Sequence, residues 1–211
     1  MKHETKHKVA AAVGMAMIGS AAIVSPIANA IDVTPSVTVK NAITLTLNSE
    51  LSFGTIRANY NNGSTVATLN LSANPATATV VAQGNSGSTI NEIVKGAPAS
   101  LSIADAGPFS SIFIQMPATA ISLTAAVGGG APAEFSIPAD TWKLRKTSGT
   151  AADLTFTAAN DQATIQVDGA GAATFTVGAT LSTDPAVTGG KDNYVLDETT
   201  YEGTFAVTVS Y

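Results

Sequence analysis

The sequence predicts an all-β fold, and three features support this. Thr, Val, Ala, Ser and Gly dominate the chain, and only 12% of its residues are charged. Short stretches of alternating apolar and polar residues follow one another, with turns rich in Gly, Asn and Asp between them. No window of useful length has the 3.6-residue period of an amphipathic helix. Many short strands at such spacing favour a β-sandwich over a parallel sheet.

The alternation locates the strands along the chain. We expect them at 31–47, 51–56, 65–71, 77–82, 111–115, 119–127, 135–137 with 142–144, 154–157, 163–167, 173–181 and 201–211. The stretch 96–108 is the least regular of the sequence, and we expect a long surface loop there.

Residues 1–30 have the pattern of an export signal. A basic start leads into an apolar, alanine-rich run at 9–24, a Ser-Pro pair follows, and small residues precede a cleavage site after Ala30. The run is too short and too rich in Ala and Gly for a membrane anchor, which needs roughly 20 strongly apolar residues. We therefore expect an exported mature chain without a transmembrane segment, with an N-terminal extension at 31–42 and one β-sandwich domain at 43–211.

Charge and cysteine content restrict the partners and the stabilising bonds. The chain has 10 basic and 15 acidic residues. Loss of Lys2, Lys6, Lys8 and Glu4 with the signal leaves 7 and 14, a net charge of −7. An acidic surface argues against nucleic acid as a partner. Cysteine is absent, so burial and backbone pairing must hold the fold together.

The mature chain lacks the groups that most enzymes use. Both histidines lie in the signal, so no Ser-His-Asp triad is available, and the absence of cysteine excludes a cysteine nucleophile. We expect no catalytic activity, no cofactor and no metal site. Two weaker alternatives are a carboxylate pair, Glu134 with Asp140, and a calcium loop at Asp192, Asp197 and Glu198. Solvated loop carboxylates are the favoured interpretation of both groups.

One basic cluster suggests an alternative function. Lys143, Arg145 and Lys146 flank Trp142, an arrangement that resembles a sugar- or anion-contacting patch, although the outer face of a strand explains it better. With the expected loop at 96–108, this patch would serve a self-complemented, secreted β-sandwich that binds glycan or matrix.

The two ends of the mature chain carry the most information. The stretch 201–211 is an alternating strand, and we expect no later strand to pair with it. The sandwich would then have an open groove, whose edge is a template for a strand from a neighbour. The segment IDVTPSVTV, at 31–39, has the alternation of such a strand. Its apolar residues are Ile31, Val33, Val37 and Val39. It could equally be the first strand of its own closed sandwich, although Pro35 favours an edge or added strand.

Three pieces of sequence resemble a known family. They are LSFGTI at 51–56, GAGAATFTVGATLS at 169–182 and the closing YEGTFAVTVSY at 201–211. Together with the alternating segment after the signal, they resemble pilin subunits of chaperone–usher fimbriae, or a related family of secreted β-sandwich proteins with pilin-like ends. The likeness spans nearly all the mature chain as a pattern. Its departure is the absence of the disulfide that many pilins carry.

The resemblance implies a fold and a role. It implies an incomplete immunoglobulin-like sandwich completed by a donor strand, in a homopolymeric surface fibre of a Gram-negative bacterium that serves adhesion or biofilm formation. A periplasmic chaperone and an outer-membrane usher would be the assembly partners. The donor residues would be Ile31, Val33, Val37 and Val39. The acceptor groove would be lined by Phe205, Val207 and Val209, with Tyr201 and Tyr211 nearer its ends.

Overall fold

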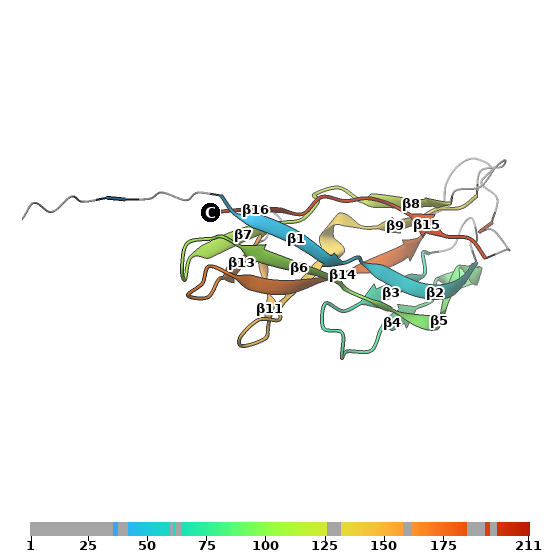
Figure 1. Cartoon of the computed structure of the whole chain (residues 1–211). Coiled ribbons are helices and arrows are strands. Elements are labelled where there is room, and N and C mark those ends of the chain that lie inside the picture. Colours follow the sequence, from blue (N-terminus) through green and yellow to red (C-terminus); the bar gives the residue numbers. More distant parts are fainter. Residues whose placement is uncertain are drawn as a thin grey trace, which may run out of the picture. The chain divides into compact units, whose positions relative to one another are not determined.

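The computed structural model describes residues 36–37, 42–59, 61, 65–125, 132–157, 162–184, 193–194 and 198–211. In these residues the protein is built of β-strands, with two short 3-10 helices, η1 (Asn85–Gly87) and η2 (Ala139–Thr141). The predicted all-β class is confirmed, and the antiparallel sheets form a sandwich (Figure 1). Within the described residues, no helix has the length and hydropathy that crossing a membrane requires.

The larger sheet follows the order β1-β6-β14-β9-β8-β15, with β10, β11, β3 and β4 attached beside this path. Its strands are β1 (Thr44–Ser49), β3 (Thr68–Leu71), β4 (Val80–Ala82), β6 (Ala99–Ala104), β8 (Ile121–Ala125), β9 (Phe135–Ile137), β10 (Lys143–Lys146), β11 (Ala152–Leu154), β14 (Ala173–Thr183) and β15 (Tyr201–Glu202). β14 is the central strand, because it pairs with β6, β10, β3 and β9.

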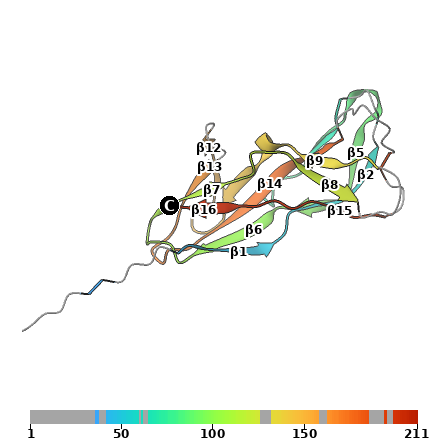
Figure 2. The same ribbon diagram turned by 90° about the horizontal axis from the view of Figure 1, so that it is seen from above.

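The smaller sheet has the order β12-β13-β7-β16. Its strands are β7 (Ser111–Gln115), β12 (Phe156–Thr157), β13 (Gln162–Gln166) and β16 (Thr208–Ser210). All of its pairings are antiparallel. Figure 2 shows β16 and β7 running together over the larger sheet.

A long two-stranded ribbon forms one side of the molecule. β2 (Ser52–Asn59) pairs with β5 (Thr89–Ala97) as a separate two-stranded sheet. The strands that adjoin this pair in sequence, β1 and β6, are also antiparallel neighbours, at the edge of the larger sheet. The expected surface loop at 96–108 is therefore wrong over most of its length. Pro98 lies in the break between β5 and β6, where the ladder needs no donor from it. Leu101 and Ile103 of β6 are buried, so tertiary pairing outweighs the local Gly and Pro signals.

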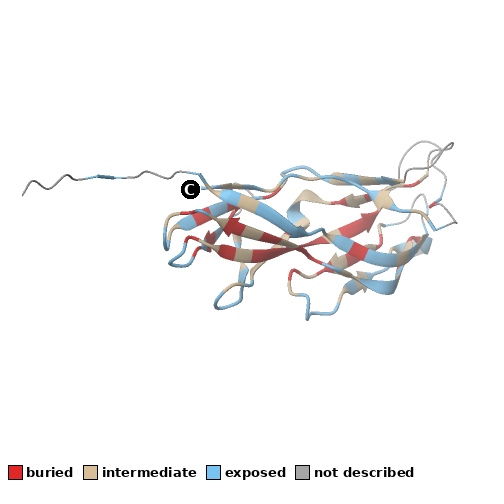
Figure 3. Ribbon diagram, viewed as in Figure 1, coloured by how far each residue is buried: buried red, intermediate tan, exposed pale blue. Residues whose placement is uncertain are grey.

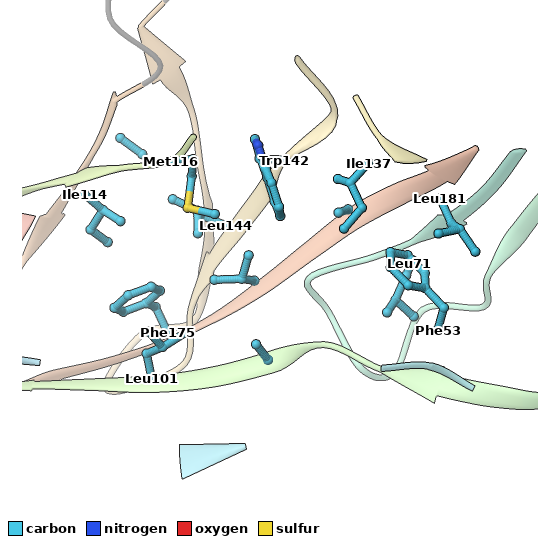
Figure 4. Close-up of a cluster of buried hydrophobic side chains, with 14 of the residues drawn as sticks. Phe53, Leu71, Leu101, Ile114, Met116, Ile137, Trp142, Leu144, Phe175 and Leu181 are labelled. Atoms are coloured by element: carbon cyan, nitrogen blue, oxygen red, sulfur yellow. The ribbon is translucent and has the colours of Figure 1, made fainter. Parts of the chain in front are cut away.

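The core lies between the two sheets. Leu101, Leu144 and Phe175 of the larger sheet meet Ile114 of the smaller one and the adjacent Met116 in a single buried cluster (Figure 4). Phe175 on β14 is fully buried. These side chains alternate with outward-facing polar residues, which is the period-two pattern that the sequence displays.

Residues 201–211 form two short strands where the sequence predicts one. Tyr201–Glu202 pair with Thr124 and Ala125 of β8, whereas Thr208–Ser210 pair with 113–115 of β7. The partner segment between these ladders, 116–123, is three residues longer than 203–207, so the pairing cannot continue in register. Pro117 lies in that segment and lacks a backbone donor. The direction and inward face of the predicted strand are nevertheless kept.

Candidate functional site: an open side of the core

The candidate site lies between two edge strands. β1 is at the edge of the larger sheet, and β16 is at the edge of the smaller one. At one end a single turn holds both of them. Thr44 Oγ1, at the start of β1, donates to Asp105 Oδ2 at 2.7 Å, and Gly107 N donates to the Tyr211 hydroxyl oxygen at 2.9 Å. Figures 1 and 2 both show β1 and β16 on this same side of the molecule.

The inward face of β1 is poorly covered. Leu45 lies opposite Ile103 and Leu47 opposite Leu101. Residues directly opposite each other in an antiparallel pair point to the same face of the sheet. Ile103 and Leu101 are buried, yet Leu47 is 56% exposed and Leu45 is only partly buried. The core is therefore open beside β1.

The inward face of β16 shows the same deficit. Val209 lies opposite Ile114, which is fully buried, but Val209 itself is only partly buried. Alternation places Val207 and Tyr211 on the same face as Val209. Val207 is partly buried, and Tyr211 is 50% exposed. We call the surface lined by Leu45, Leu47, Phe205, Val207, Val209 and Tyr211 the open side; Figure 3 shows its strands in tan and blue beside the red core.

Aromatic rings close the other end of the open side. The ring of Phe205 packs on that of Trp142 at a centroid distance of 4.7 Å. Tyr201 meets Phe135 edge-on at 5.1 Å and Tyr194 at 5.8 Å. Both Phe205 and Tyr201 pack against the core while remaining partly buried.

Gly203 lies between Tyr201 and Phe205, at a close approach of two chain segments. A Cβ atom at this position would come within 2.4 Å of the Ser122 backbone oxygen. A glycine here lets residues 201–205 lie close against β8.

The five residues predicted for the acceptor groove lie along 201–211, from Tyr201 at one end to Tyr211 at the other. Tyr201, Phe205, Val207 and Val209 pack against the core, and Tyr211 extends their row. Sequence reasoning did not place Leu45 and Leu47 of β1 on the opposite wall. The signal that could have found them is the alternation of 43–47, which continues that of the preceding segment.

The predicted donor residues fall mostly outside the described part of the chain. Ile31, Val33 and Val39 lie outside the described residues. Val37 is described, and it is 86% exposed. The signal at 1–30 also lies outside the described residues.

The basic cluster around Trp142 does not form the alternative binding patch. Trp142 is buried, and its Nε1 donates to the Pro117 backbone oxygen at 3.2 Å. Arg145 forms an ion pair with Asp153 at 2.7 Å, and Lys143 Nζ donates to Asn70 Oδ1 at 2.5 Å. Because side chains alternate across the sheet, Trp142 and Leu144 point inward, whereas Lys143 and Arg145 point outward.

The carboxylate candidates lie elsewhere in the fold. Glu134 accepts a hydrogen bond from Ser122 Oγ, and its backbone N donates to Asp184 Oδ2 at 3.1 Å; Asp140 lies in η2. Of the alternative calcium loop, Asp192 and Asp197 lie outside the described residues, and Glu198 is exposed. Among the residues that the structure describes, no three His, Cys, Asp or Glu side chains gather closely enough to hold a metal ion.

The open side consists of apolar side chains and two strand edges. Such a surface can pair with an extended peptide through backbone hydrogen bonds and receive its alternate side chains. No family model matches the chain, and comparisons with curated proteins and with solved structures gave no match either.

Proposed function

We propose that the protein is a structural subunit of a bacterial surface fibre that polymerises by donor-strand exchange. The observation that carries this proposal is the open side. Leu45 of β1 and Val209 of β16 face the core but are only partly buried, and Leu47 is 56% exposed, while the residues opposite them are buried. A strand placed between β1 and β16 would cover those side chains and pair with both edges.

The occupant in this proposal is segment 31–39 of another copy. Four of its side chains, Ile31, Val33, Val37 and Val39, alternate with smaller or polar residues. Nine extended residues span about 30 Å, which suits a groove that runs along a sandwich. Burial of four such side chains contributes on the order of 6–12 kcal/mol, reduced by the entropy lost when the segment becomes ordered.

The family resemblance supplies the other parts of the proposal. Such subunits are exported, capped by a periplasmic chaperone and transferred by an outer-membrane usher to a growing fibre that serves adhesion or biofilm formation. The open side supports this scheme, because uncovered apolar side chains in a free subunit would favour aggregation. The proposed role is structural and involves no catalysis.

The test uses a matched pair of substitutions in neighbouring residues. Val207 faces the core and Thr208 faces solvent. Mature protein analysed without boiling should give a detergent-resistant ladder. Val207→Asp should abolish that ladder, because a carboxylate would stand where donor side chains enter, whereas Thr208→Asp should leave it intact. Circular dichroism of both variants checks that the subunit still folds.

A second pair tests the donor segment. Val33→Asp should abolish the ladder, and Thr34→Asp on the other side of the segment should preserve it. A monomeric mature protein whose fold does not change on deletion of 31–39 would contradict the proposal. That result would favour the alternative of a self-complemented binding module. No contact among the described residues favours that alternative, since Trp142 is buried and most of 96–108 belongs to strands and their connections.

A further inference from the structure

Phe109 is an exposed aromatic residue held in an unfavourable backbone conformation. Its side chain is 69% exposed, and its φ is +55°, a region that bulky residues rarely adopt. Its backbone N donates to the backbone carbonyl oxygen of Asp168 at 2.9 Å. A Cβ atom at Gly169 would lie 2.9 Å from Phe109 Cζ, so the ring rests against that backbone. The fold therefore fixes an apolar ring toward solvent, and retained strain of this kind is typical of functional positions.

Phe109 lies at the end of the sandwich where β1 begins. The same β6–β7 turn contains Asp105 and Gly107, which bond Thr44 and Tyr211. We call this the near end, and the end at Tyr201 the far end (Figure 1). The first residue of β1 therefore lies beside the turn that carries Phe109.

The short linker restricts where the near end can lie in a fibre. Five Cα–Cα steps separate Val39 from Thr44, and they span at most about 18 Å. The near end of the donating copy must therefore lie close to the point where its segment leaves the accepting copy. If the segment left at the near end of each acceptor, the near ends of successive copies would crowd together. A linear fibre requires the segment to leave at the far end.

We propose that Phe109 is a contact between successive copies, packing against the far end of the copy that accepts its segment. This inference rests on the proposed function and adds a second, non-strand interface to it. Exposed residues described at the far end include Thr124 of β8 and Glu202 of β15, which pair with each other. A ring buried there would fix the angle between neighbouring copies through a contact other than the donor strand.

The absence of native cysteine makes a single-site cross-linking test possible. Phe109→Cys, labelled with a benzophenone maleimide, should cross-link on illumination to peptides from 119–125 or 198–204 of a neighbouring copy, in polymer only. Thr164→Cys, on an exposed position of β13, is the matched control and should give no such product. A polymer that forms its ladder but cross-links from position 109 no more than the control would overturn the inference and leave the proposed function standing.

A substitution separates an interface role from a structural one. Phe109→Gly suits the positive φ and should not lower the melting temperature of the free subunit. It should leave the ladder intact and make the fibres more flexible in electron micrographs. A lower melting temperature of the free subunit, or unchanged fibre stiffness, would contradict the interface role. Absence of a ladder in the unsubstituted protein would overturn this inference together with the proposed function.

Discussion

The two sides of the sandwich use the same residue types in the same alternation but differ in how far those residues are covered. On β6 and β7, Leu101, Ile103 and Ile114 are buried. On the adjoining edge strands, Leu47, Leu45 and Val209 lie opposite them in register and face the same core, yet they remain partly or largely exposed. The difference arises because β1 and β16 are edge strands, and no further strand among the described residues lies beside them to cover their side chains.

The contrast has an energetic meaning. A covered apolar side chain contributes about 1.5–3 kcal/mol to folding, and a half-exposed one contributes correspondingly less. Covering the apolar side chains of the open side would therefore stabilise the subunit further. In the proposed fibre, that stabilisation becomes available when the donor segment is bound.

The largest expected effect is on the closed side, by which we mean the buried residues of β6, β7 and β14. Phe175→Ala removes a fully buried ring from β14 and should lower the free energy of unfolding by about 3–5 kcal/mol, because a cavity remains. Urea denaturation followed by tryptophan fluorescence measures this, since Trp142 is buried in the same core. A loss below about 1 kcal/mol would mean that the closed side is not the more tightly packed one.

The next effect sharpens the contrast from the open side. A synthetic peptide with the sequence of 31–39, added at one hundred times its dissociation constant to a chain starting at residue 42, should stabilise that chain by about 2.7 kcal/mol. A peptide with Asp in place of Val33 and Val37 is the control and should have no effect. Thermal unfolding measures both. Equal stabilisation by the two peptides would show that the apolar side chains do not enter the open side.

A smaller effect is expected for Leu47. Because the side chain is 56% exposed, Leu47→Ala should lower the unfolding free energy of the isolated subunit by less than about 1 kcal/mol. The same change should destabilise the polymer more, since the donor strand would cover this side chain. The temperature at which the ladder dissociates in detergent, compared with that of Thr46→Ala on the outward face, measures the difference.

The smallest effect concerns the turn that links β13 to β14. Asp168 Oδ1 accepts hydrogen bonds from Ala172 N at 3.0 Å and Ala170 N at 2.9 Å. These bonds hold the pKa of Asp168 below its ordinary value of 3.8. The stabilisation by this carboxylate is thus complete above pH 3.8 and is lost as the pH falls through the lowered value.

The sign of this effect can be tested with a neutral isostere. Asp168→Asn keeps an acceptor oxygen, so its melting temperature should fall less steeply with acid below pH 3.8 than that of the unsubstituted protein. Tyr211 is the one ionisable residue among those that define the open side, so Val207→Ala should not alter this pH profile. Identical acid profiles for Asp168→Asn and the unsubstituted protein would contradict the assignment.

Much of the fold could be predicted from alternation, and its failures have physical causes. The strand at 173–181 is recognisable because its apolar residues recur at every second position, and β14 occupies it. The strand at 99–104 escaped prediction because Gly96, Pro98 and Pro108 are local turn signals. Its pairing with β1 and β14, far away in sequence, decides its conformation.

The candidate site was predicted in part for a similar reason. The inward face of 201–211 follows from period two, and the structure packs Phe205, Val207 and Val209 of that face against the core; their role as an acceptor groove stays a prediction. The alternation of 43–47 marks an inward face on β1, but local pattern does not encode which strand lies across the core from that face. The same limit applies to Trp142, which is buried in the core, whereas Lys143 and Arg145 lie on the opposite face of the sheet.

Hydrogen exchange of the two edge strands tests the central claim most directly. In 44–49 and 208–210, the backbone amides that face away from the paired strand should exchange quickly in the free subunit. Their exchange should slow markedly in the polymer. The amides of β14, paired on both sides in the free subunit, should change little. Protection confined to the two edge strands is the result that donor-strand exchange predicts. Polymer in which both edges exchange as fast as in the free subunit would contradict it.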